Sequence, residues 1–284
     1  MNNSQDLIHA ASPPGKWNSS HLKRIVTSAI GIPSLVILVL YGNSLLFWFL
    51  IASCILLGLM EFYNLLAHRE IHCFRSVGLG LGLIISIGFW WHIPFLPYLT
   101  ITLAVIIPLL VSLFIPQDIS SVIPKILGTM AGVFYVAWLL SHLIWIHDLP
   151  QGKAMVMYLF LIVWAGDSAA FYLGRTFGKH KLSPTISPKK SVEGAAGGML
   201  GSILISVMAH VTFLKHLSLG HIIFLGFFLN LLGQLGDLAE SLLKRGAGIK
   251  DSGTLIPGHG GILDRIDSLL FAGPALYYYM SMLV

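Results

Sequence analysis

The chain has 284 residues, of which 56% are hydrophobic and only 10% are charged. Soluble domains carry roughly 25% charged residues, so this composition excludes an ordinary soluble protein and places the chain in a lipid bilayer. Its net charge of +5 would suit nucleic acid, but the basic residues lie in short loops beside apolar segments, which excludes a nucleic-acid-binding surface and favours membrane lipids as partners.

Residues 1–24 form the first predicted segment, a flexible cytoplasmic tail that is polar and contains the run SPPG at 12–15. The apolar run after it extends from Ile25 to Tyr41. It has no small-residue cleavage site and is followed at once by another apolar run, which favours a retained membrane anchor over a signal peptide.

Nine apolar segments in all have the length and composition of membrane-spanning helices, so we predict an all-α integral membrane protein. They are expected at about 25–41, 44–66, 77–91, 94–115, 126–146, 155–173, 194–214, 221–243 and 262–284. The first five are nearly free of ionisable groups, whereas polar residues crowd positions 164–267. We therefore divide the chain into a scaffold at 25–150 and a C-terminal region at 151–284 that carries the chemistry.

The basic residues predict how these spans are oriented. With the N-terminus inside, only Lys153 and Lys215 of the 17 Lys and Arg fall in outside segments, which leaves 15 inside. Such an excess of Lys and Arg in short loops marks the cytoplasmic side of a membrane. The N-terminus is therefore predicted to be cytoplasmic and the C-terminus to lie outside.

A carboxylate and a basic loop are the first candidate site residues along the chain. Asp167 lies within the predicted span 155–173, where a carboxylate costs about 2.5–3.5 kcal/mol, and intramembrane charges usually mark functional sites. Arg175 follows, and the next loop holds Ser187, Lys189 and Lys190 before a glycine-rich helix start. Lysines and the N–H groups of a helix start can bind phosphate, although an ordinary cytoplasmic loop explains the same residues.

A polar stripe continues the span 221–243 into the cytoplasm. Asp237, Glu240, Ser241 and Lys244 follow i, i+3, i+4 and i+7 spacing, so they share one face of a helix. A polar stripe where lipid-facing residues should be apolar points into the bundle or into a wet cavity. The alternative is a set of interfacial charges that pair with one another.

Glycines and two further carboxylates precede the last span. Gly260 and Gly261 belong to a glycine-rich loop whose backbone amides can approach a phosphate. Asp264 and Asp267, at i and i+3, present two carboxylates on one helical face. Together with Asp237 they predict a Mg²⁺ site, because Mg²⁺ prefers oxygen ligands and keeps waters and substrate phosphates in its shell.

Gly128 and Gly132 form a small-residue pattern in an apolar segment. Such a pattern indicates close approach of two helices, either within one monomer or across a homodimer. Both interpretations stay open at this point.

The run from Ser241 to Asp267, SLLKRGAGIKDSGTLIPGHGGILDRID, closely resembles the signature of the phosphatidate cytidylyltransferases, also called CDP-diacylglycerol synthases. Similarity extends to Asp167–Arg175 and to 187–194, so it covers the C-terminal part of the chain from position 160. The resemblance implies a Mg²⁺-dependent reaction of CTP with phosphatidate that gives CDP-diacylglycerol and pyrophosphate. With the orientation given by the basic residues, the active site is expected on the cytoplasmic face, in the inner membrane if the source is a bacterium.

The resemblance further implies roles for individual residues. The metal ligands would be Asp237 and Asp264, with Asp267 as a further ligand or a partner of one, and the number of metals stays open. These three and Lys244 and Lys250 form the expected catalytic set. The expected substrate-binding set is Asp167, Arg175, Ser187, Lys189, Lys190, Ser241, Arg245, His259, Gly260, Gly261 and Arg265.

Two other functions are compatible with some of these features. A CTP-dependent lipid kinase of the polyprenol or phytol kinase type has broadly similar acidic motifs but transfers the γ-phosphoryl group. The His-Gly-Gly and Asp-x-x-Asp ending favours the cytidylyltransferase through the resemblance. An anion transporter would also place charges within spans, but the sequence has no evident inverted repeat and its polar groups gather at one membrane face.

Overall fold

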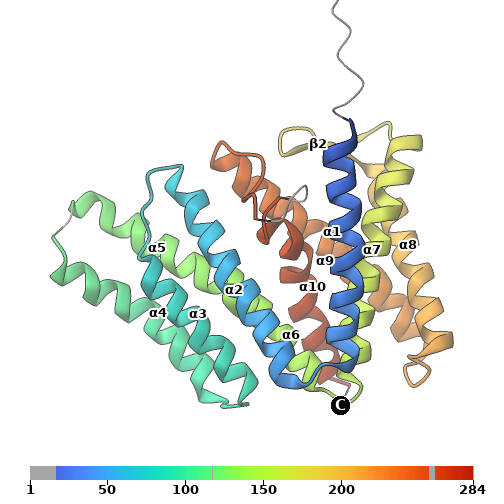
Figure 1. Cartoon of the computed structure of the whole chain (residues 1–284), viewed down its shortest axis with the longest axis horizontal. Helices are drawn as coiled ribbons and strands as arrows, with labels where there is room; N and C mark the ends of the chain where they lie inside the picture. Colours follow the sequence, from blue (N-terminus) through green and yellow to red (C-terminus); the bar gives the residue numbers. More distant parts are fainter. Residues whose placement is uncertain (1–16, 117, 256–259, 284) are drawn as a thin grey trace, which may run out of the picture.

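The computed structural model describes residues 17–116, 118–255 and 260–283, with side chains of the first segment described from residue 27. The protein is a bundle of helices with one two-stranded sheet (Figure 1). The elements up to residue 148 are α1 Trp17–Tyr41, α2 Ser44–Ala67, α3 Arg75–Trp90, α4 Phe95–Phe114, η1 Ile119–Ser121, α5 Val122–Gly132, the π-helical η2 Val133–Trp138 and α6 Leu139–Asp148. The later elements are α7 Gly152–Phe177, β1 Lys181–Ser183, β2 Ser187–Ser191, α8 Val192–Thr212, α9 Leu219–Gly246 and α10 Leu263–Ser281.

Each predicted span corresponds to helical structure in the described part of the chain, with shifted ends. Helix α1 starts at Trp17, so the end of the predicted tail is helical, and residues 1–16 lie outside the described residues. The span predicted at 126–146 belongs to one longer helical stretch, Ile119–Asp148, that includes the π-helical turns of η2. Hydroxyl and amide side chains set several starts: Asn43 caps α2, Ser191 caps α8 and Ser218 caps α9.

Six of the described helical stretches are long and apolar enough to cross a membrane, which makes this a multi-pass membrane protein. They are Ser44–Ala67, Phe95–Phe114, Ile119–Asp148, Gly152–Phe177, Val192–Thr212 and Leu219–Gly246. Thr27–Tyr41 and Arg75–Trp90 are shorter apolar helices. The start of α10 carries Asp264, Arg265 and Asp267, which make this helix more polar than the others.

The loop predicted before α8 contains a short β-hairpin, while the rest of the described fold is helical, as expected for an all-α membrane protein. Strands β1 and β2 pair antiparallel, with Lys181 opposite Ser191. Pro184 and Pro188 argue against strands in the sequence, because proline donates no ladder hydrogen bond. A contact outside the strands holds the base of the hairpin: Glu193 accepts the N–H groups of Lys179 and His180 at 3.0 and 3.2 Å.

The loops with the candidate site residues gather at one end of the bundle. Figure 1 shows the start of α1, the hairpin and the end of α9 at this end, and the end of α10 at the opposite one. This placement follows from helices that alternate in direction along the chain. It brings residues far apart in the sequence into one region.

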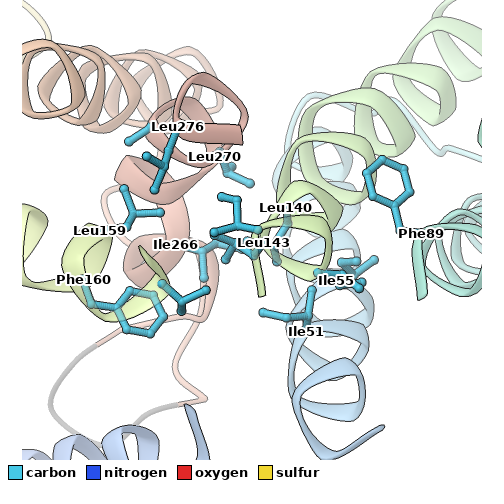
Figure 2. Packing of buried hydrophobic residues seen from close by; sticks show 14 of the residues in the cluster. Ile51, Ile55, Phe89, Leu140, Leu143, Leu159, Phe160, Ile266, Leu270 and Leu276 are labelled. Atoms are coloured by element: carbon cyan, nitrogen blue, oxygen red, sulfur yellow. The ribbon is translucent and has the colours of Figure 1, made fainter. Parts of the chain in front are cut away.

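The core joins the two halves of the chain through α6 and α10. In Figure 2, Leu140 and Leu143 of α6 lie between Ile266 of α10 on one side and Ile51 and Ile55 of α2 on the other. Other buried members of this core include Phe89, Leu159, Phe160, Leu270 and Leu276. The start of α10 is thereby held against the N-terminal half.

Gly128 and Gly132 serve close packing within one chain. A Cβ atom at Gly132 would lie 2.5 Å from the ring of Tyr63, and one at Gly128 would lie 2.6 Å from Sγ of Cys73. The hydroxyl of Tyr63 also donates to the carbonyl oxygen of Thr129 at 3.0 Å. Packing inside the monomer, one of the two interpretations of this pattern, is therefore confirmed.

Candidate active site

A polar cavity of about 290 Å³ lies between α7, α9, α10 and the segment that precedes α10. Its lining is almost entirely charged: Asp167, Asp237, Lys244, Asp251, Asp264, Arg265, Asp267 and Ser268. Six of these eight residues were predicted as site residues from the sequence. The fold therefore assembles much of the predicted set in one place.

Lys244 connects the polar face of α9 to the start of α10. Its Nζ lies 2.5 Å from Oδ1 of Asp264 and also forms an ion pair with Glu240, one turn earlier on α9. Glu240 is completely buried. A buried carboxylate needs a charged partner, so the lysine holds two anionic side chains in the bundle interior.

Lys190 of β2 connects the hairpin to the same face of α9. Its Nζ lies 2.6 Å from Oδ2 of Asp237, while Ser241 donates to Oδ1 of Asp237 at 3.4 Å. The side chains of Lys190 and Asp237 keep 28% and 33% of their surface exposed, so a ligand can reach this pair. The predicted stripe from Asp237 to Lys244 is thus confirmed as one inward face of α9.

Asp264 and Asp267 differ in how their oxygens are used. Oδ2 of Asp264 accepts the N–H of Gly261 at 2.8 Å and that of Ser252 at 3.1 Å. Asp267 is 9% exposed, and its Oδ1 accepts the N–H of Ser268 at 2.7 Å. Asp264 is therefore held firmly by the chain around it.

The donor set of this cavity suits a hard cation, since five aspartates line it and Mg²⁺ prefers carboxylate oxygens. Among the residues that the structure describes, however, no three His, Cys, Asp or Glu side chains are close enough to form a metal site. The two lysines instead neutralise Asp237 and Asp264. A cation here would take only part of its shell from the protein, and phosphates and waters would supply the rest, as is usual for Mg²⁺.

Other predicted residues lie outside this cavity. Arg175 is exposed in the last turn of α7, Lys189 is exposed on β2, where Ser187 is half-buried, and Lys250 is exposed after α9. The side chain of Arg245 donates to the carbonyl oxygens of Ile186 and Ile249, which ties α9 to the hairpin. His259 lies outside the described residues.

The two glycines of the expected phosphate-binding loop, Gly260 and Gly261, both lie against the carboxylate of Asp264. Gly260 has a φ of 85°, and a Cβ atom there would lie 2.6 Å from Oδ2 of Asp264. The N–H of Gly261 already donates to Asp264. At the start of α8, likewise, the N–H groups of Val192 and Gly194 donate to His180 and Ser191, so fewer amides are free for an anion than expected.

Sequence reasoning assigned no role to Glu61, Asp251 or Ser268. Asp251 and Ser268 line the cavity, and Glu61 of α2 accepts hydrogen bonds from the start of α10. The signal for Glu61 was present, since it is a carboxylate within an apolar span, the same signal that indicated Asp167.

A second, larger cavity of about 520 Å³ adjoins the polar one and is mainly apolar. It shares Asp167, Asp264, Arg265, Asp267 and Ser268 with the polar cavity. Its apolar walls come from α1, α2, α6, α7 and α10, with residues such as Leu35, Leu50, Leu143, Phe160 and Trp164. A single molecule with a charged head and apolar chains fits this combination.

The chain belongs to the cytidylyltransferase family, whose model matches residues 22–283. It is similar to the phosphatidate cytidylyltransferase of Bacillus subtilis (strain 168), with 40% identity over 155 residues that cover 54% of this chain and 57% of that protein. The enzyme of the same name from Staphylococcus epidermidis is 47% identical over 126 residues, which are 44% of this chain and 48% of that protein.

The segments matched in these two relatives thus span about half of each protein. A longer match is to the phosphatidate cytidylyltransferase of Synechocystis sp., with 31% identity over 295 residues that cover 92% of this chain and 97% of that protein. The similarity therefore reaches across both halves of the molecule.

Proposed function

We propose that this chain transfers the cytidylyl group of CTP to phosphatidate, which gives CDP-diacylglycerol and pyrophosphate. The observation that carries the proposal is the junction of a charged cavity with an apolar one through five shared residues. Phosphatidate has an anionic phosphate and two apolar chains, so its two parts match the two cavities. Membership of the cytidylyltransferase family supplies the reaction type.

In the proposed reaction, an oxygen of the phosphatidate phosphate attacks the α-phosphorus of CTP. The bond between the α-phosphorus and the bridging oxygen breaks, and pyrophosphate leaves with the electron pair. The substrate brings its own nucleophile, so the protein has to hold two anions in line and offset their repulsion. Lys244 lines the polar cavity and pairs with Asp264, and Lys190 pairs with Asp237 of the same lining, so both positive charges can move from carboxylate to phosphate.

We propose Asp237 and Asp264 as the protein ligands of Mg²⁺ at this site, with Asp267 as a further ligand or a partner of one. When bound, Mg²⁺ would add positive charge beside the phosphates and help to offset the charge of departing pyrophosphate. Asp237 and Asp264, which now pair with Lys190 and Lys244, would hold the ion, and the two lysines would then pair with phosphate oxygens. Such an exchange would leave neither of these two carboxylates without a positive partner, which matters where water is largely excluded.

We further propose nine membrane crossings, with the site facing the cytoplasm and, in a bacterium, the inner membrane as the location. Helix α1 begins at one end of the bundle and α10 ends at the opposite end, which supports an odd number of crossings (Figure 1). In a variant without Cys54 and Cys73, cysteines introduced at Ser183 and Leu149 should be labelled from opposite sides of sealed vesicles. Labelling of both from one side would reject the nine-crossing arrangement.

The reaction itself is tested with CTP that carries ³²P at either the α or the γ position, incubated with purified protein, Mg²⁺ and phosphatidate. The proposal expects the α label in the lipid and both other phosphates in pyrophosphate. Transfer of the γ label would make the protein a lipid kinase. If neither label is transferred to any anionic lipid, both the cytidylyltransferase and the lipid kinase are rejected, and an anion transporter is favoured.

A further inference from the structure

Glu61 is a buried carboxylate of α2 that reaches the start of α10 from the other half of the chain. It is 7% exposed. Its Oε1 accepts the N–H of Ile262 at 3.0 Å, and its Oε2 accepts the N–H of Leu263 at 2.8 Å. The first N–H groups of a helix have no partner within the helix and carry its positive dipole end, so they compensate the buried charge.

Ser252 connects Glu61 to Asp264. Its hydroxyl oxygen lies 3.0 Å from Oε2 of Glu61 and 3.0 Å from Oδ2 of Asp264. A serine hydroxyl carries a single proton, so the two carboxylates share one donor. The position of either carboxylate therefore depends on the other.

The glycines around this contact leave space for Glu61. A Cβ atom at Gly261 would overlap Oε2 of Glu61, and one at Gly253 would overlap Oε1. Two glycines of the segment before α10 are thus explained by a carboxylate from α2. Five positions of the described chain thus donate a hydrogen bond to Glu61 or leave space for it: Ser252, Gly253, Gly261, Ile262 and Leu263.

We propose that Glu61 is a positioning residue, which fixes the carboxylate of Asp264 in the polar cavity through Ser252 and through the start of α10. Glu61 does not itself line that cavity, so it acts through these two neighbours. The inference deepens the proposed function, because Asp264 is one of the proposed Mg²⁺ ligands. It also gives the N-terminal half a direct part in the geometry of the site.

The test compares Glu61→Gln and Ser252→Ala in purified full-length protein. A glutamine has only one acceptor oxygen for three donors, so the start of α10 has to shift. Ser252→Ala keeps both backbone hydrogen bonds of Glu61 and the backbone N–H that position 252 donates to Asp264. It removes only the hydroxyl between the two carboxylates, so it decides the matter if Glu61→Gln does not fold. Glu70→Gln, an exposed change at the same end of α2, and Ser141→Ala, whose hydroxyl bonds locally to Ala137, are the controls.

Three quantities are measured: kcat and KM, binding of Mn²⁺ in the presence of CTP by electron paramagnetic resonance, and the melting temperature in detergent. We expect each test variant to weaken Mn²⁺ binding and lower kcat about tenfold, as is typical for partners that orient metal ligands. KM for phosphatidate should change little. The double variant should be no worse than Glu61→Gln alone, because both changes break one connection.

Unchanged Mn²⁺ affinity and kcat in folded Ser252→Ala would overturn the positioning role, even if the melting temperature falls, and would leave Glu61 as a structural contact between the halves. Wild-type protein that binds Mn²⁺ but transfers no cytidylyl group would instead reject the proposed function. In that case the Mn²⁺ affinity of the two variants alone decides the positioning role: weaker binding supports it, and unchanged binding rejects it.

Discussion

Lys244 on α9 and Asp264 on α10 form an ion pair of 2.5 Å at the point where the two helices enclose the polar cavity. The same ammonium group pairs with Glu240, which has no contact with solvent. One lysine thus balances two carboxylates of different exposure. Because Lys244 sits at the centre of this set, its removal affects both the stability of the bundle and the charge of the cavity.

Lys244→Met should destabilise the protein strongly and abolish turnover. Loss of one member of a buried ion pair leaves the other uncompensated, which typically costs about 3–5 kcal/mol. The melting temperature in detergent should therefore fall, and a second change, Glu240→Gln, should restore part of it without restoring activity. Lys215→Met, at an exposed position away from the site, is the control. A wild-type melting temperature for Lys244→Met would mean that the pair contributes nothing.

Asp264→Asn should abolish turnover while the protein still folds. A neutral amide keeps the shape of the side chain but removes the charge that a Mg²⁺ ligand needs. Its NH₂ group must also face either Lys244 or the N–H groups of Ser252 and Gly261, so a modest fall in melting temperature accompanies the loss. Activity measured against Mg²⁺ concentration checks this. Near-normal activity would remove Asp264 from the metal site.

The membrane helices were predictable because hydrophobic length along the chain is a local property. The polar face of α9 was predictable for the same reason, since i, i+3, i+4 and i+7 spacing already places Asp237 and Lys244 on one side. For the start of α10, the sequence predicted which residues belong to the site but not what they contact. Which atoms Asp264 contacts depends on the fold of the segment before it.

The contacts that the sequence did not predict all join distant segments. Glu61 meets Ser252 across 191 positions of the chain, and no local pattern encodes that meeting. The hairpin was missed because its two prolines outweigh the weak strand pattern, whereas Glu193 stabilises it from the first turn of α8. The apolar cavity likewise exists only once α1 lies beside α7.

Lys190→Ala should weaken substrate use without unfolding the protein. The Lys190–Asp237 pair is partly exposed, and such pairs contribute about 1 kcal/mol or less to stability. A hydrogen bond from the ammonium to a phosphate contributes about 1.5–3 kcal/mol, so KM for CTP or phosphatidate should rise about 10- to 100-fold. Steady-state kinetics at several Mg²⁺ concentrations check this result. Recovery at high Mg²⁺ would contradict direct phosphate contact.

Gly31→Phe tests whether the apolar cavity holds the acyl chains. Gly31 of α1 lines this cavity, and a Cβ atom there would meet no atom within 4 Å, so a phenyl ring enters space that is empty of protein. Phenylalanine is also a better helix former than glycine, which favours folding. A displaced acyl chain stays in the surrounding lipid or detergent, so the expected loss is steric.

The loss should therefore depend on chain length. For phosphatidate with long acyl chains, kcat/KM should fall about tenfold, within the range that shape exclusion gives in apolar pockets, while short-chain phosphatidate should react almost as with the unchanged protein. Gly80→Phe on α3 is the matched control, since a Cβ atom at Gly80 also meets nothing within 4 Å and this glycine does not line the cavity. Equal losses for long and short chains would place the acyl chains elsewhere. A loss that appears equally in Gly80→Phe would show that the added ring acts through the membrane-facing surface and not through the cavity.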